Sequence, residues 1–106
     1  MGIEADGKTQ ATIPEKFTLY NNYPNPFNPT TTIRYDLAER SKTSLSVYNI
    51  AGERIRTLVN DVQSAGSKSV VWNGRNDQGE IVGSGVYVYQ IEADGTVKTK
   101  KMIFLK

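Results

Sequence analysis

Hydrophobic and polar residues alternate most clearly in residues 31–37. Ile33, Tyr35 and Leu37 fall on one side of this run, and polar side chains fall on the other. Successive side chains of a β-strand point to opposite faces of its sheet. The run therefore predicts a strand that buries one face and exposes the other.

Residues 43–50 repeat the pattern. Leu45 and Val47 are predicted to point inward, whereas Ser44 and Ser46 are predicted to point outward. A short apolar run covers residues 17–20, and further strands are predicted over the segments 54–59, 69–72, 86–91 and 96–105. Turn residues punctuate the chain every 8–12 residues or so, a spacing typical of an all-β sandwich.

The last two predicted strands form a hairpin. Residues 86–91 are hydrophobic on both faces, which predicts the most buried strand of the fold. Asp94-Gly95, which follows, is a strong signal for a two-residue hairpin turn.

The final run, residues 96–105, has two hydrophobic sets. Val97 and Ile103 share one face, and Met102 and Phe104 share the other. The pattern leaves two interpretations open, namely a bulge near residues 100–101 or a strand covered on both faces at its end.

Two further turns are predicted, and the proline-rich segment is also irregular. Gly52 ends the run 43–50 and is expected to adopt a positive φ, and residues 73–79 are dense in Asn, Asp and Gly. Residues 23–29 contain three prolines, so this segment must be extended or turning and cannot be a central strand.

Composition argues against catalysis. The 106 residues include no cysteine and no histidine, which removes the thiolate nucleophile and the usual general base near neutral pH. The eleven acidic residues are interpreted as solvated surface groups. The net charge of +2 is too small to indicate nucleic-acid binding. We expect a protein that is not an enzyme, has no cofactor and does not bind nucleic acid.

Two candidate binding sites in the sequence also have simpler structural interpretations. Asn73, Asn76, Asp77 and Glu80 could form a calcium loop, but Asn and Asp side chains more often cap their own turn. Four aromatic residues could form a carbohydrate platform, although aromatic side chains at strand spacing are more often core. They are Tyr48, Trp72, Tyr87 and Tyr89.

The end of the chain is basic. From Gly95 onward there are four lysines and no acid. These lysines are interpreted as a solvated edge strand protected against aggregation, or as an exposed strand that a partner recognises by strand addition. They are Lys98, Lys100, Lys101 and Lys106.

Residues 1–16 have no clear hydrophobic period and are predicted to be a linker, or an arm added by cloning, that precedes a single domain over residues 17–106. The opening residues have neither a basic nor an apolar region and do not form a signal peptide. No hydrophobic stretch is long enough to span a bilayer.

Several motifs, taken in order, resemble the type A C-terminal sorting domains of the type IX secretion system of Bacteroidetes-like bacteria. That family is related to the immunoglobulin-like domain of flagellar hook-capping proteins. The segments that carry the resemblance are Tyr23-Pro24-Asn25-Pro26-Phe27, 31–35, 47–55, 71–79, 84–89 and 100–106. Two departures are mild: Asn73 stands where the family often has an acid, and Phe104 where it often has Leu or Val.

The resemblance implies an immunoglobulin-like antiparallel β-sandwich of about seven strands. It also implies a non-catalytic module that directs an N-terminal passenger domain from the periplasm through an outer-membrane translocon to the cell surface or the medium. Removal of the domain by cleavage would be expected before Phe17.

In that family the signal is concentrated in the closing element, here Gly85 to Lys106. The expected recognition residues are Gly85, Tyr87, Lys98, Lys100, Lys101, Met102, Ile103, Phe104, Leu105 and Lys106. The expected structural positions are Pro24, Asn25, Pro26, Phe27, Gly52, Trp72 and Gly79. The alternatives are an accessory carbohydrate-binding module and a structural spacer of a secreted multidomain enzyme.

Overall fold

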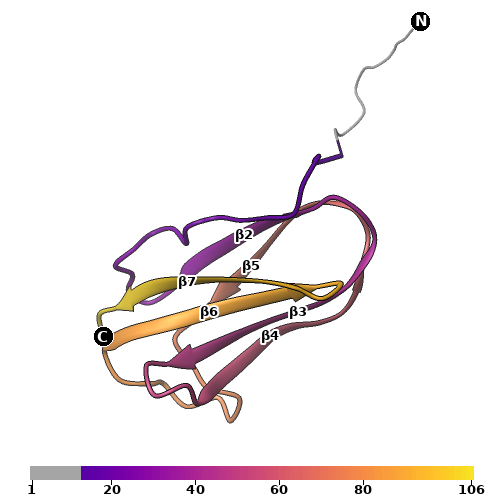
Figure 1. Cartoon of the computed structure of the whole chain (residues 1–106). Helices are drawn as coiled ribbons and strands as arrows, with labels where there is room; N and C mark the ends of the chain where they lie inside the picture. Colours follow the sequence, from indigo (N-terminus) through magenta and orange to yellow (C-terminus); the bar gives the residue numbers. More distant parts are fainter. Residues whose placement is uncertain (1–12) are drawn as a thin grey trace, which may run out of the picture.

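Two antiparallel sheets pack face to face in the computed structural model, which describes residues 13–106 (Figure 1). The three-stranded sheet has the order β1-β2-β5, with β1 at Thr18–Leu19, β2 at Thr31–Leu37 and β5 at Gly66–Trp72. The four-stranded sheet has the order β4-β3-β6-β7, with β4 at Arg54–Gln63, β3 at Ser41–Asn49, β6 at Gly85–Ala93 and β7 at Thr96–Phe104. The predicted all-β sandwich of seven strands is confirmed.

Residues 1–12 lie outside the described part, and with them most of the predicted linker. Among the described residues, no helix is long and apolar enough to cross a membrane.

The core lies between the two sheets. Every inward position predicted in β2 and β3 is buried, including Ile33, Tyr35 and Leu37 on one sheet and Leu45 and Val47 on the other. The alternation of side chains therefore placed these two strands correctly.

Ser46 is a correction, because it was predicted to point to solvent and is only 6% exposed. It lies on β3, which has a neighbouring strand on each side. Thr57 of β4 and Gln90 of β6 stand beside it across the sheet. A side chain as short as serine is covered by longer cross-strand neighbours.

The prediction that β6 is buried on both faces is wrong. Tyr87, Tyr89 and Ile91 are buried, but Val86 is 41% exposed and Val88 is only half-buried. Val86 and Val88 lie on the outer face of the four-stranded sheet, and no element of the described part of the chain forms a third layer over that face.

In β7, neither predicted explanation for its two hydrophobic sets holds. The pairing with β6 continues without a shift from Ala93↔Thr96 to Gly85↔Phe104. Met102 and Phe104 point into the core, whereas Val97 and Ile103 are 50% and 40% exposed. The strand is regular, and its second hydrophobic set faces outward.

β4 and β5 extend further than the sequence predicted. β4 continues to Gln63, which pairs with Ser41, and β5 begins at Gly66, which pairs with Leu37. Polar residues such as Asn60 and Asp61 join β4 because they pair with Ser44 and Thr43 of β3. A hydrophobic pattern does not reveal such pairing.

The predicted turn geometries are confirmed at two positions. Gly52 has a φ of 87° after β3. Asp94 and Gly95 have φ values of 49° and 83°, which is the pair of positive angles that a tight hairpin between β6 and β7 requires.

Candidate functional site

The proline segment, residues 23–29, binds the last residues of β7, and we call it the strap. The Phe27 N–H donates to the Ile103 carbonyl over 3.0 Å, and the Leu105 N–H donates to the Phe27 carbonyl over 3.0 Å. The Asn25 Oδ1 accepts the Ile103 N–H at 2.9 Å. The strap therefore occupies the outer edge of β7 near the end of the chain and satisfies its backbone groups there.

An aromatic cluster anchors the strap to both sheets. The Phe27 ring stacks on the Phe104 ring, with centroids 4.9 Å apart, and lies 5.6 Å from that of Trp72. The Trp72 ring meets the Tyr87 ring edge to face at 5.4 Å. Because these rings are buried, the cluster joins the strap, β5, β6 and β7 into one end of the sandwich.

The turn after β5 fits closely against this cluster. The Trp72 Nε1–H donates to the Arg75 carbonyl at 2.9 Å. Gly74 has a φ of 73°, and a Cβ atom there would lie 2.8 Å from the Phe104 ring. Gly79, later in the same turn, also has a positive φ but has open space around it.

Apart from Gly85, the predicted recognition residues separate into one buried group and two surface groups. Tyr87, Met102 and Phe104 are core residues, and the 2.7 Å bond from the Tyr87 hydroxyl to the Gly83 carbonyl holds the entry to β6. Gly85 begins β6. The others reach the surface in two separate places.

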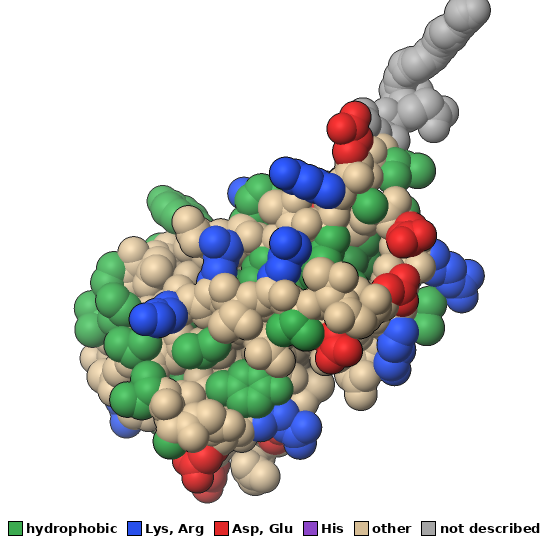
Figure 2. Space-filling view, viewed as in Figure 1, with side chains coloured by type: hydrophobic (Ala, Val, Ile, Leu, Met, Phe, Trp, Pro, Cys, Tyr) green, Lys and Arg blue, Asp and Glu red, His purple; other side chains and the backbone are tan. Residues whose placement is uncertain are grey.

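The first surface group surrounds the end of β7, and we call it the terminal patch. It consists of Val86, Lys101, Ile103, Leu105 and Lys106. Ile103 stands opposite Val86 on the outer face of the four-stranded sheet, and Leu105 is 52% exposed. The Lys106 N–H donates to the Ser84 Oγ at 2.7 Å, which ties the end of the chain to the entry of β6. Figure 2 shows hydrophobic side chains gathered at this end of the molecule.

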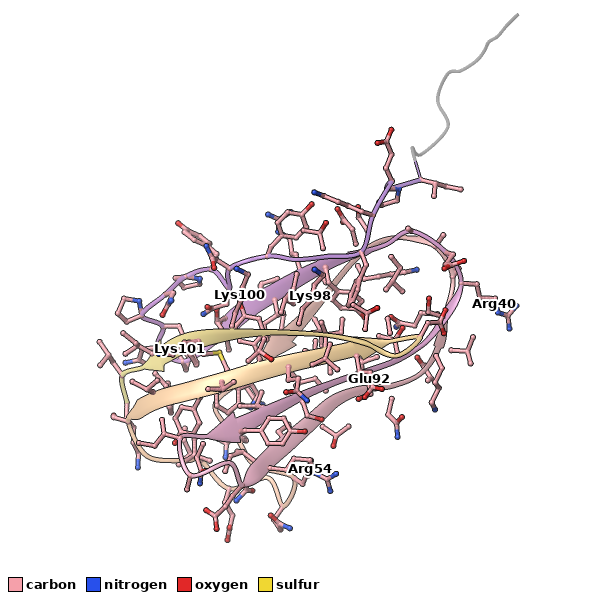
Figure 3. All side chains as sticks on the ribbon, in the orientation of Figure 1. Arg40, Arg54, Glu92, Lys98, Lys100 and Lys101 are labelled. Atoms are coloured by element: carbon pink, nitrogen blue, oxygen red, sulfur yellow. The ribbon has the colours of Figure 1, made fainter. Side chains whose placement is uncertain are left out.

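The terminal patch combines exposed aliphatic side chains with two exposed lysines, of which Lys101 is labelled in Figure 3. Such a surface can bind a protein partner through apolar contact, with charge setting the orientation.

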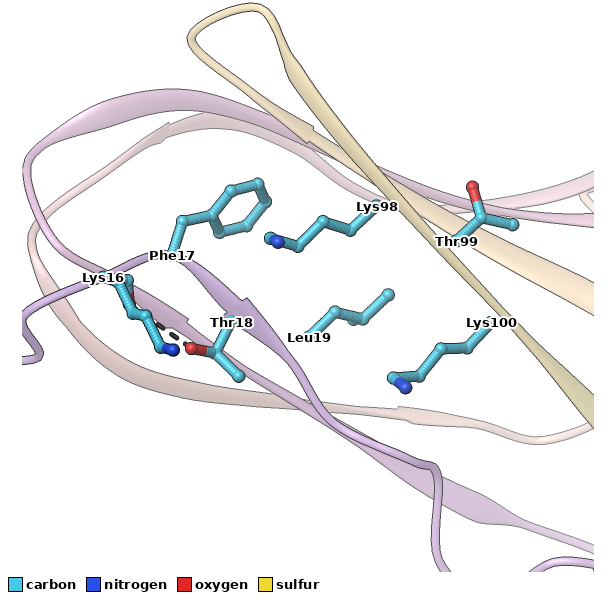
Figure 4. A pocket seen from close by; sticks show the side chains of 7 residues that line it. All are labelled: Lys16, Phe17, Thr18, Leu19, Lys98, Thr99 and Lys100. Carbon is cyan, nitrogen blue, oxygen red and sulfur yellow. Dashed lines mark hydrogen bonds between the residues drawn. The ribbon is translucent and has the colours of Figure 1, made fainter.

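The second surface group lies in a groove between β1 and β7, and we call it the lysine groove. It has a volume of about 360 Å³ and is lined by Lys16, Phe17, Thr18, Leu19, Lys98, Thr99 and Lys100. Lys98 and Lys100 extend from β7 over the apolar side chains of Phe17 and Leu19 (Figure 4). The Lys98 Nζ lies 5.5 Å from the centre of the Phe17 ring, within range of a cation–π contact.

In the turn formed by residues 73–80, the side chains of Asn76 and Asp77 accept hydrogen bonds from backbone N–H groups. The Asn76 Oδ1 accepts the N–H groups of Gln78 and Glu80 at 3.0 and 2.9 Å. The Asp77 Oδ1 accepts the Thr57 N–H at 3.0 Å. Within residues 13–106, no three acidic, histidine or cysteine side chains gather as a metal site would need. The geometry supports the capping interpretation of this turn.

The interpretation of the strand aromatics as core residues is confirmed for three of the four, and the alternative of a carbohydrate platform is not supported. Trp72 and Tyr89 are fully buried and Tyr87 is 8% exposed, so only Tyr48 of the four reaches solvent. Trp72, Tyr87 and Tyr89 belong to the core because each lies at an inward position of its strand.

Two buried phenols act as neutral anchors. The Tyr89 hydroxyl donates to the Tyr20 carbonyl at 2.7 Å and accepts the Asn22 N–H at 2.9 Å. Burial raises the pKa of Tyr89, and the bond from Asn22 partly offsets that rise. Burial also raises the pKa of Tyr87.

Sequence reasoning missed the lysine groove and the attachment of the strap to β7. The groove had a signal, because Lys98 and Lys100 share a face with Met102 and Phe104 and so point inward. The attachment had none, since it joins Asn25 to Ile103 across most of the chain.

Comparisons with known proteins agree with this architecture. The family described as "FlgD Ig-like domain" matches residues 26–96, which is more than half of the chain. The search of curated proteins found no match to this chain.

Three solved structures are similar. FlgD from P. aeruginosa has 25% identity and a TM-score of 0.56, over 70% of this chain and 59% of that one. PorZ from Porphyromonas gingivalis has 21% identity and a TM-score of 0.58, over 83% of this chain and 11% of that one. Dimeric latent PorU from the same species has 18% identity and a TM-score of 0.65, over 98% of this chain and 10% of that one. The likenesses to PorZ and PorU show the fold alone.

Proposed function

The chain belongs to the FlgD Ig-like domain family, and we propose that it serves as a non-catalytic sorting module of a larger secreted protein. In this proposal the domain directs a passenger through the type IX outer-membrane secretion system to the cell surface or the medium. Its partners are the translocon and the attached passenger.

The single observation that carries the proposal is the arrangement of the closing hairpin, β6 and β7. Its inward residues hold the hairpin in the core, while its outward residues form the terminal patch. The strap fixes the end of the chain in place. A recognition element needs such a rigid support for its exposed side chains.

Two further observations support the link to secretion. The sequence motifs of the strap and of the closing hairpin resemble those of the type A sorting domains. One structure with this fold, PorZ, is described as an essential bacterial surface component of the type IX secretion system.

A reporter fusion tests the proposal. A periplasmic reporter is fused in front of residues 17–106 and expressed in a bacterium with a type IX secretion system. The controls are the same fusion in a strain that lacks the translocon, and the reporter alone without the domain. We expect the reporter outside the cell only when both the domain and the translocon are present. Equal retention of the fused and unfused reporters in the periplasm would contradict the proposal.

A structural module is the second candidate, favoured by the family match itself and by the likeness to FlgD. Such a module would hold neighbouring domains or self-associate. It predicts that the exported fraction does not change when the domain is removed, and that the purified domain associates in sedimentation experiments.

A further inference from the structure

Among residues 13–106, nothing pairs with the outer edge of β7 over its first half. Ile103 directs both its N–H and its carbonyl outward, to Asn25 and Phe27 of the strap. In an antiparallel strand every second residue points the same way. Val97, Thr99 and Lys101 therefore direct their backbone groups away from β6, and none of those groups has a partner within residues 13–106.

This free edge lies beside the lysine groove. Lys98 and Lys100 are half-buried on the inward face of β7, above Phe17 and Leu19. With Lys16 they give the groove three ammonium groups, and no acidic residue lines it. In the described part of the chain none of these lysines forms an ion pair.

We propose that an extended acidic segment of a partner protein adds to the edge of β7 as a further strand. Its backbone would bond to Val97, Thr99 and Lys101, as in other cases of strand addition. Its carboxylates, on alternate residues, would face Lys98 and Lys100 over the apolar floor. The remaining side chains would be aliphatic and lie beside Val97 on the outer face.

The charges argue for a partner of different sequence. If two copies paired through β7, Lys98 and Lys100 of one would approach those of the other, and like charges in neighbouring strands are destabilising. The strap closes the edge at Ile103, so the added strand ends near Lys101. The site is thus a short acceptor for alternating acidic and aliphatic residues.

This inference rests on the proposed function only for the identity of the partner, which would belong to the secretion machinery. The binding itself can be measured without secretion. The probe is a blocked nine-residue peptide of alternating glutamate and valine, added to the labelled full chain and followed by NMR and amide hydrogen exchange.

We expect new exchange protection at the amides of Val97, Thr99 and Lys101, because strand addition bonds them directly. K98E/K100E should weaken binding about tenfold, whereas R40E/K42E, which makes the same change of charge elsewhere, should leave it within about twofold. Thr99→Pro should abolish the protection and keep the fold, since the Thr99 N–H does not bond to β6.

Three outcomes would overturn the inference: no chemical shift changes at millimolar peptide, equal binding of a lysine–valine peptide, or binding without protection of these amides. The third would mean that the groove recognises negative charge alone. If export still depends on residues 17–106 in those cases, the sorting proposal stands without the acceptor site. If the peptide binds and K98E/K100E is exported normally, the acceptor exists but the translocon does not read it.

Discussion

At the scale of single residues, Gly74 is the position where backbone conformation and packing coincide. Its φ is positive, and the Phe104 ring lies where a Cβ would be. The ring belongs to the buried aromatic cluster and cannot move without disturbing Phe27. Gly79 has a positive φ but no such contact. Comparing the two glycines therefore separates the cost of backbone conformation from the cost of a clash with the ring.

Gly74→Ala should therefore destabilise the domain more than Gly79→Ala. We expect about 1–2 kcal/mol at either position for placing a Cβ-bearing residue at a positive φ, and roughly a further 1–3 kcal/mol for overpacking at Gly74. Urea unfolding of both variants measures the difference. Equal losses would show that the turn relaxes away from the ring.

Tyr89→Phe should reduce stability by about 1–3 kcal/mol at neutral pH, because the Asn22 N–H and the Tyr20 carbonyl lose their shared partner. The variant should also lose less stability in alkali. The pKa of Tyr89 is raised in the folded state, so its contribution is complete below a pH of about 10 and falls as pH rises through the folded pKa. Unfolding measured from pH 8 to 12 tests this. An alkaline decline as steep as in the parent would contradict it.

At the scale of elements, sequence patterns located β2, β3, β6 and the Asp94-Gly95 hairpin, because these depend on local alternation and turn chemistry. They failed for the ends of β4 and β5, which are set by pairing with β3 and β2 and not by a local hydrophobic pattern. The prediction that β6 is buried on both faces was wrong, because a hydrophobic pattern does not reveal how many layers pack on a sheet. The sequence located the closing segment, Gly85 to Lys106, but did not separate its buried residues from its exposed ones.

The strap is the element whose role depends most on one side chain. Phe27→Ala should cost about 3–5 kcal/mol, because it removes a buried ring from the aromatic cluster. Tyr23 lies in the same strap but is 79% exposed, so Tyr23→Ala should change the free energy of unfolding by less than about 0.5 kcal/mol. Thermal unfolding, with amide exchange at Leu105, measures both. A mild effect of Phe27→Ala would mean that the strap is not a structural part of the sandwich.

At the scale of the whole molecule, the closing hairpin is both part of the core and part of the proposed signal. Deleting residues 97–106 removes Met102 and Phe104 from the core and leaves β6 without its partner. We expect this truncated domain to be unfolded, with loss of the near-ultraviolet circular dichroism. If it instead kept native stability, β7 would be dispensable for the fold. Terminal deletion therefore cannot separate folding from sorting, and surface substitutions are needed.

The exported fraction of a reporter fused to residues 17–106 tests the central claim most directly. K101E/I103S changes the terminal patch and leaves the core residues in place. K42E/V62S makes the matched change on a cross-strand pair of the same sheet, where both residues are exposed. With the two domains equally stable, we predict export of the control and periplasmic retention of the patch variant. Equal export of both would contradict the claim that the terminal patch is the sorting signal.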